Sequence, residues 1–122
     1  MLTINSQPFE ATINPVGAEL SSLKVNGTEY LWQGDETYWS GRAPILFPIV
    51  GALKNDRMFY QGQRYEMQKH GIARRALFEC VSSSENAISL RLRSDKQSLQ
   101  HYPWQFELLV HFTLNDTGLS IG

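Results

Sequence analysis

Residues 105–114, with the sequence QFELLVHFTL, decide the fold class of this 122-residue chain. Apolar side chains occupy every second position of the stretch: Phe106, Leu108, Val110, Phe112 and Leu114. A period of two places all of these side chains on one face of a β-strand, whereas a helix requires a period of about 3.6. The stretch therefore predicts a long strand with one face buried in a core.

Shorter stretches elsewhere show the same alternation and are separated by turn residues. Strands are predicted at residues 9–13, 16–25, 29–33, 58–60, 64–67, 73–82 and 87–93. Asn26-Gly27 and Gln61-Gly62-Gln63 are typical of hairpin turns between antiparallel strands. Only Asp95–His101 has room for a helical turn, and Pro103 ends it. The chain is thus predicted to be all-β, an antiparallel β-sandwich forming a single domain over residues 1–122.

The last residues leave the extent of this domain open. Asn115–Gly118 predicts a turn, and Leu119 begins a new strand that stops after four residues. A complete domain that ends on a strand and a part of a larger β domain both fit this pattern.

Composition argues against several classes of protein. Eleven Lys and Arg against twelve Asp and Glu give a net charge of −1, which provides no positive field for nucleic acid or an anionic membrane. The longest apolar run, Pro44–Val50, is too short to cross a bilayer, and the first ten residues lack the pattern of a signal peptide. We therefore expect a cytoplasmic protein without nucleic-acid or membrane partners.

Neither the single cysteine nor the three histidines predict a metal site. Cys80 cannot form an internal disulfide, and it alternates with Phe78, so we expect it to be buried. His70, His101 and His111 are too widely spaced to match a metal-binding motif. The sequence therefore predicts no metal and no cofactor.

The densest polar cluster lies at Lys69–Arg75. In a regular strand His70 and Arg74 would project from the same face, and both side chains donate directed hydrogen bonds, which suits the recognition of hydroxyl groups. The positive charge of Arg74 would also keep His70 neutral. The alternative is a loop histidine beside a solvated basic strand.

Two segments before this cluster each allow two interpretations. Tyr30–Trp39 holds four aromatic side chains, including Trp39, and such rings either stack on sugars or fill a core. Arg42–Gly51 contains Pro44 and Pro48, which central strands do not tolerate. This second segment is predicted to be either a buried irregular edge or the rigid rim of a pocket.

Five segments taken together resemble one family, the aldose 1-epimerases or galactose mutarotase-like proteins. They are Gly17–Leu23, Glu29–Gln33, Tyr38-Trp39, Ala43–Gly51 and His70–Arg74. The resemblance runs from residue 1 to residue 122 and implies the N-terminal part of a larger antiparallel supersandwich. Such proteins interconvert the α and β anomers of a hexose or hexose phosphate by acid–base chemistry without a cofactor.

The resemblance also implies a set of substrate-binding residues. His70 and Arg74 match the family's sugar-contacting His and Arg, although Ile72 stands where the family usually has Phe. Arg42 is expected to line the same cleft, and Trp39 completes the predicted set as an aromatic contact.

No catalytic residue is predicted in this chain. The family's acid histidine lies in a His-Pro-Tyr-Phe-like motif and its base glutamate lies further on, both beyond Gly122. Neither His101-Tyr102-Pro103 nor Glu107 matches them. The chain is therefore expected to supply only part of a substrate cleft.

Two alternatives to this function remain open: a catalytically silent sugar-binding module and a purely structural β domain. Uncovered strand edges would favour self-association.

Overall fold

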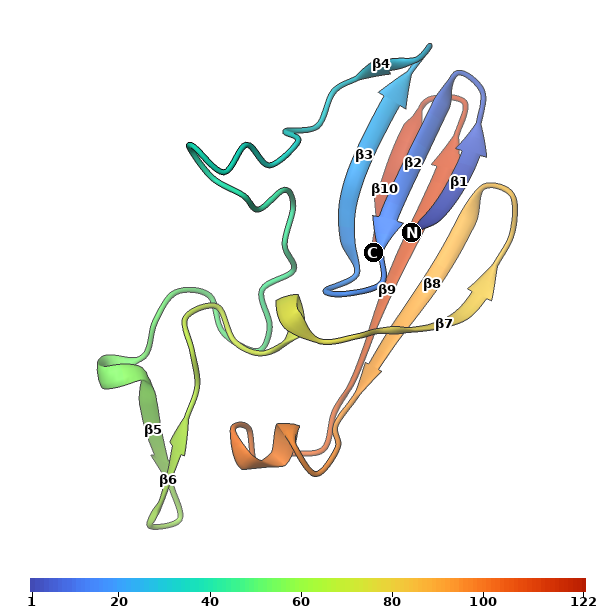
Figure 1. The fold of residues 1–122 in the computed structure, drawn as a ribbon. Helices are drawn as coiled ribbons and strands as arrows, with labels where there is room; N and C mark the ends of the chain where they lie inside the picture. Colours follow the sequence, from blue (N-terminus) through green and yellow to red (C-terminus); the bar gives the residue numbers. More distant parts are fainter.

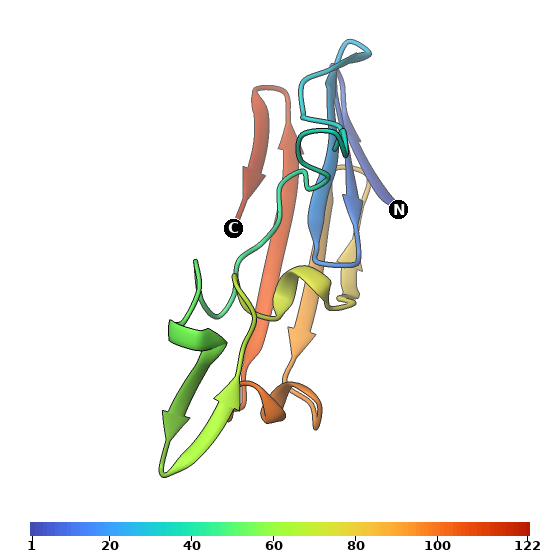
Figure 2. The ribbon, with the colours of Figure 1, turned by 60° about the vertical axis from the view of Figure 1, so that its left-hand side comes forward.

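The computed structural model describes residues 1–122 and contains two antiparallel four-stranded sheets. The first sheet has the order β1-β2-β3-β4, with β1 at Leu2–Ser6, β2 at Phe9–Asn14, β3 at Glu19–Val25 and β4 at Thr28–Glu29. The second has the order β10-β9-β8-β7, with β7 at Glu79–Ser83, β8 at Ala87–Arg93, β9 at Glu107–Asn115 and β10 at Gly118–Ile121. Figure 1 shows the strands of both sheets, and Figure 2 shows the sheets as two separate layers.

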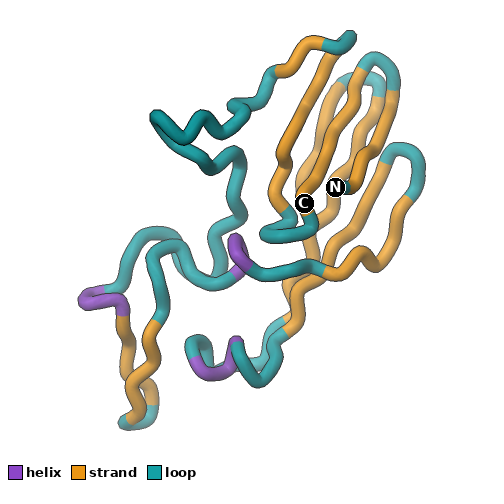
Figure 3. Tube along the Cα trace, in the orientation of Figure 1, coloured by secondary structure: helices purple, strands orange, loops and turns teal.

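A third, smaller unit projects from this sandwich. It is the two-stranded hairpin of β5 (Arg57–Tyr60) and β6 (Gln63–Glu66), at the lower left of Figure 1. The structure has no α-helix, only three short 3₁₀ turns: η1 (Lys54–Asp56), η2 (Ala73–Arg75) and η3 (Ser98–Gln100). Figure 3 shows how much of the chain between β4 and β5 is loop. None of these turns has the length and hydropathy that a membrane-spanning helix requires.

The core lies between the two sheets and confirms the prediction made from residues 105–114. On β9, Val110, Phe112 and Leu114 are buried while the residues between them face outward or are half-buried. Ile4 and Ile13 of the first sheet belong to the same buried cluster. The strand begins at Glu107 rather than Gln105 and continues to Asn115. The all-β sandwich and both predicted hairpins are also confirmed.

Four corrections apply to the predicted strands: one strand was missed, and three have other bounds than predicted. Leu2–Ser6 forms β1, which was not predicted because only Leu2 and Ile4 supply apolar alternation. The strand predicted from residue 16 begins at Glu19, because Ala18 has a left-handed backbone with φ 47°. Residues 30–33 leave the sheet after Glu29.

The fourth correction concerns the strand predicted over residues 73–82. It is replaced by η2 and a strand that begins only at Glu79, because the backbone here bonds to loop residues instead of a neighbouring strand. Cys80 is exposed, so the prediction of a buried cysteine was wrong. It lies on β7, the edge strand of the second sheet, beside a register shift between Cys80 and Ser82, and all five residues of β7 are exposed.

Candidate functional site

Two loop segments lie side by side and form the frame of the candidate site. Phe47 pairs with Gly71 in a parallel bridge, and the Phe47 carbonyl accepts hydrogen bonds from the amides of Ile72 (2.8 Å) and Ala73 (3.2 Å). Gly71 has φ +78°, and a β-carbon at this position would overlap the Phe47 carbonyl. Only glycine therefore allows the proline-containing segment and the His70 segment to approach this closely.

His70 is held by Gly51 through two hydrogen bonds. Its amide donates to the Gly51 carbonyl (2.8 Å), and its Nδ1 accepts from the Gly51 amide (2.9 Å). Because Nδ1 acts as an acceptor, the ring is neutral and its proton sits on Nε2. Partial removal from water, followed by the charges of Lys69 and Arg74, holds the pKa of His70 below its ordinary value of 6.5. The ring therefore presents an N–H donor near neutral pH, and the predicted effect of Arg74 has the expected direction.

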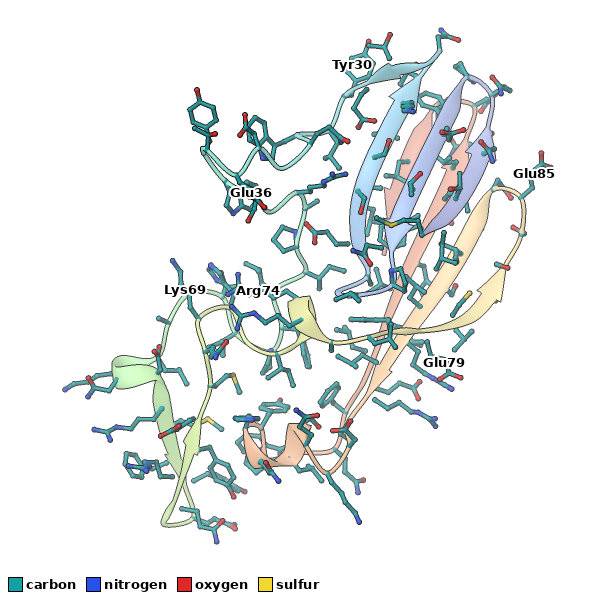
Figure 4. The ribbon with its side chains drawn as sticks, viewed as in Figure 1. Tyr30, Glu36, Lys69, Arg74, Glu79 and Glu85 are labelled. Atoms are coloured by element: carbon teal, nitrogen blue, oxygen red, sulfur yellow. The ribbon has the colours of Figure 1, made fainter.

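Arg74 lies within electrostatic reach of His70, although by a different route from the one predicted. His70 has a left-handed backbone (φ 68°) and Arg74 belongs to η2, so the two residues do not share the face of a regular strand. The Arg74 Nη2 donates to the Lys69 carbonyl at 3.2 Å, while its Nε is buried without a hydrogen-bond partner. In Figure 4 the Arg74 side chain extends from η2 toward the segment that carries Lys69. The charge of Arg74 therefore acts on His70 from a turn and not from the same face of a strand.

Arg42 is engaged with β3 rather than free. Its Nη1 donates to the Ser21 carbonyl (2.6 Å) and to Gln33 Oε1 (3.3 Å). The amides of Arg42 and Ala43 both donate to Glu19 Oε1, at 2.8 and 2.9 Å. These bonds fasten the loop after β4 to the first sheet, and they use the Nη1 group of Arg42.

Trp39 lies in an exposed aromatic segment, residues 30–39, and not in the core. Trp39 is 53% exposed, and its carbonyl accepts a hydrogen bond from Trp32 Nε1 at 2.7 Å. The rings of Trp32 and Tyr38 meet edge to face at 6.3 Å. Tyr30 and Tyr38 are 71% and 80% exposed. In Figure 4 Tyr30 and Glu36 lie in the loop beside the sandwich, so the core interpretation of these aromatics was wrong.

The segment Arg42–Gly51 combines features of both predicted interpretations. It forms no strand and is half-buried along most of its length, with Ala43, Ile45 and Phe47 packed against the core cluster. Its carbonyl and amide groups at Phe47 and Gly51 also hold the His70 segment. The sequence analysis did not single out Gly51 or Glu19, although a glycine at the end of a proline-containing segment was a usable signal.

A hollow of about 570 Å³ lies near this frame, and neither His70 nor Arg74 lines it. Arg75 lines it instead, together with Gly71 and Ile72. No three His, Cys, Asp or Glu side chains converge on a common point that would hold a metal ion.

Comparison with known proteins identifies the family. The family model for aldose 1-epimerase matches residues 1–122. This chain belongs to the aldose 1-epimerase family. Two LacX proteins of Lactococcus lactis subsp. lactis, one plasmid-encoded and one chromosomal, are each 41% identical to this chain over 126 residues. The match covers 98% of this chain but 42% of either LacX protein.

Solved structures show the same relationship for the fold. A galactose mutarotase-like protein from Lactobacillus casei ATCC 334 superposes with a TM-score of 0.95 at 36% identity, covering 99% of this chain and 42% of the other. A galactose mutarotase related enzyme from Lactobacillus acidophilus gives 0.90 at 36% identity, covering 93% and 38%. The fold predicted from the resemblance is thus confirmed. This chain spans about two-fifths of the length of these relatives.

Proposed function

We propose that this chain supplies part of the substrate cleft of an aldose 1-epimerase and binds a hexose or hexose phosphate through His70 and Arg74. The observation that carries the proposal is the fixed Nε2–H donor of His70 within electrostatic reach of the charge of Arg74. Two directed donors of this kind match the hydroxyl and ring oxygens of a sugar. Family membership supports the same assignment.

Trp39 and Arg42 have supporting roles in this proposal. The half-exposed indole of Trp39 offers an apolar face to a sugar ring. Arg42, bonded to Ser21 and Gln33, acts mainly by holding the loop that leads to the cleft. A phosphate on the substrate would interact with Arg74 and with the remaining N–H donors of Arg42.

The proposed role of His70 is binding rather than proton transfer. Ring opening of an aldose requires an acid at the ring oxygen and a base at the C1 hydroxyl. Nδ1 of His70 is already an acceptor for Gly51, and a neutral imidazole with its proton on Nε2 has no free acceptor for a hydroxyl proton. We propose that the acid and base of the complete reaction lie outside these residues.

A catalytically silent sugar-binding module is the second candidate. The same absence of a free acceptor on His70 favours this module, together with the exposed aromatic side chains of residues 30–39.

For either candidate we propose a sugar as the partner. We also propose a cytoplasmic location, because the single cysteine leaves the chain without an internal disulfide. We also propose that free edges of β7 and β10 allow copies of the chain to associate.

Exchange NMR on glucose, galactose and their 6-phosphates tests the proposal. Wild-type protein should broaden the lines of at least one sugar, and His70→Ala should weaken sugar binding about five- to tenfold and reduce the broadening accordingly, because a directed hydrogen bond of this kind contributes about 1–1.5 kcal/mol. His111→Ala is the matched control, since His111 lies on the outer face of the second sheet, bonded to Ser89.

The outcomes separate the candidates. Anomer exchange faster than in buffer would favour turnover, and broadening with exchange at the buffer rate would favour the binding module. No broadening by any of the sugars, with His70→Ala indistinguishable from wild type, would contradict both.

A further inference from the structure

The 570 Å³ hollow combines an apolar floor with a cationic rim. It lies between η2, the end of β8 and the loop that contains η3. Half-buried Ile72, Leu92 and Phe106 form apolar parts of the lining, and Leu77, which is 70% exposed, lies at its margin. Its volume is within the range of about 300–1,000 Å³ that small-molecule sites occupy in proteins.

The two arginines that line this hollow form no direct ion pair with a carboxylate. Arg75 and Arg93 form no salt bridge and no side-chain hydrogen bond, whereas the nearby Arg91 pairs with both Glu79 and Glu107. Glu107 faces Arg93 across the β8–β9 register, but its closest cation is Arg91 at 4.0 Å. Arg93 helps to lower the pKa of Glu79 but is not bonded to it, so the rim of the hollow contains two guanidinium groups without a hydrogen-bonded carboxylate.

The other polar groups of the lining do not neutralise this charge. Asp95 is the single carboxylate there, and its Oδ1 already accepts a hydrogen bond from the Ser98 amide at 2.7 Å. His101 donates from Nδ1 to the Glu66 carbonyl at 2.7 Å, because a carbonyl can only accept. The excess of cationic groups over the one carboxylate remains.

We propose that this hollow is a binding site for an anionic amphiphile, meaning a small molecule with an apolar body and a carboxylate, sulfate, sulfonate or phosphate group. The apolar body would lie on Ile72, Leu92 and Phe106, and the oxyanion would accept hydrogen bonds from Arg75 and Arg93. A free sugar does not fit this chemistry, because it has no large apolar body to cover the floor. The site is also independent of the proposed sugar site, since His70 and Arg74 do not line the hollow.

Two fluorescent dyes of similar shape and different charge test the proposal. Anilinonaphthalene sulfonate carries an apolar body and an oxyanion, and N-phenylnaphthylamine is its uncharged counterpart. Arg75→Gln and Arg93→Gln should each weaken binding of the sulfonate about fivefold, and the double variant more, because each removes one charge-assisted hydrogen bond that is partly exposed to water. Binding of the uncharged dye should change by less than about twofold.

Neighbouring residues supply matched controls. Lys96→Gln removes the same charge from an exposed residue between Asp95 and Gln97 that does not line the hollow, and should leave sulfonate binding unchanged. Leu77→Ser changes an exposed side chain of the lining and should weaken both dyes. Near-UV circular dichroism verifies that each variant keeps its packing, because loosened proteins bind such dyes non-specifically.

Three outcomes would overturn the proposal. Equal losses from Lys96→Gln and Arg75→Gln would show a general charge effect, and equal changes for both dyes in the Arg75 and Arg93 variants would show that no oxyanion is recognised. Sulfonate binding that survives the double arginine variant would place the dye elsewhere on the surface.

Discussion

The two-sheet sandwich and the segment between β4 and β7 are stabilised in different ways. The sandwich buries rows of apolar side chains from both sheets against each other. In residues 30–78, by contrast, only Met67, Gly71, Ala73 and Phe78 are buried. That segment depends on hydrogen bonds accepted by the Phe47 carbonyl and by Glu19 Oε1, on the two bonds between Gly51 and His70, and on the absence of a side chain at Gly71. The candidate site thus lies on the less buried region, where single contacts decide the geometry.

The largest difference in the free energy of unfolding is expected between alanine variants of two phenylalanines, one from each region. Phe112→Ala should lower the free energy of unfolding by about 3–5 kcal/mol, because it removes a fully buried ring and leaves a cavity. Phe59→Ala, in the hairpin, should change it by about 0.5 kcal/mol or less, since Phe59 is 69% exposed. Urea unfolding followed by circular dichroism measures both. Similar losses for the two variants would contradict the contrast between the regions.

A smaller difference in the free energy of unfolding is expected between alanine variants of two glycines with nearly the same φ angle, Gly62 and Gly71. Gly62→Ala, with φ +76° and open space around it, should cost about 1 kcal/mol from backbone strain alone. Gly71→Ala adds an overlap with the Phe47 carbonyl and should cost at least about 1 kcal/mol more.

The ring signals of His70 give a second measurement for the same pair of variants. They should shift in NMR spectra of Gly71→Ala, because the frame that holds His70 must move, and not in spectra of Gly62→Ala. Unchanged His70 signals in Gly71→Ala would show that the two loop segments are less tightly coupled than their hydrogen bonds indicate.

The smallest effect on the free energy of unfolding is expected from the titration of His70. Its pKa is lowered in the folded protein, so the unfolded chain takes up a proton first as the pH falls. Stability should therefore decrease as the pH drops below about 6.5 and level off below the lowered pKa, with no contribution above 6.5.

An NMR titration of the ring measures this pKa and also shows whether the proton sits on Nε2. The His70→Asn variant should lose this part of the pH dependence while keeping the dependence that arises from carboxylates. A His70 pKa at or above 6.5, or a proton on Nδ1, would refute the assigned hydrogen bond from Gly51.

The prediction of the sandwich succeeded where one face of a strand is buried. Phe106 to Leu114 alternate over nine residues, and burial of one face imposes that alternation on the sequence. The prediction failed at edges and turns. Leu2 and Ile4 are too few to identify β1, and Cys80 on the edge strand β7 follows an apolar alternation without being buried.

The candidate site was predicted in composition but not in geometry. The residue types of His70 and Arg74, and the direction of the charge effect between them, followed from the sequence. The sequence did not indicate that Nδ1 of His70 is occupied by Gly51, nor that Arg42 is bonded to Ser21. These partners lie about twenty residues away along the chain, and no local pattern specifies a hydrogen bond over that separation.

By itself, the sequence determined that this chain forms an antiparallel β-sandwich and which family it resembles, because the alternation of apolar residues and the motifs around His70 are local properties. Only the tertiary structure decided which donors of the site are free. It also decided that Arg74 bonds to the Lys69 carbonyl while Arg75 lines the hollow. The physical reason is that the direction of a side chain in a loop depends on backbone angles and hydrogen bonds made with distant residues, such as the left-handed turn at His70 and its contact with Gly51.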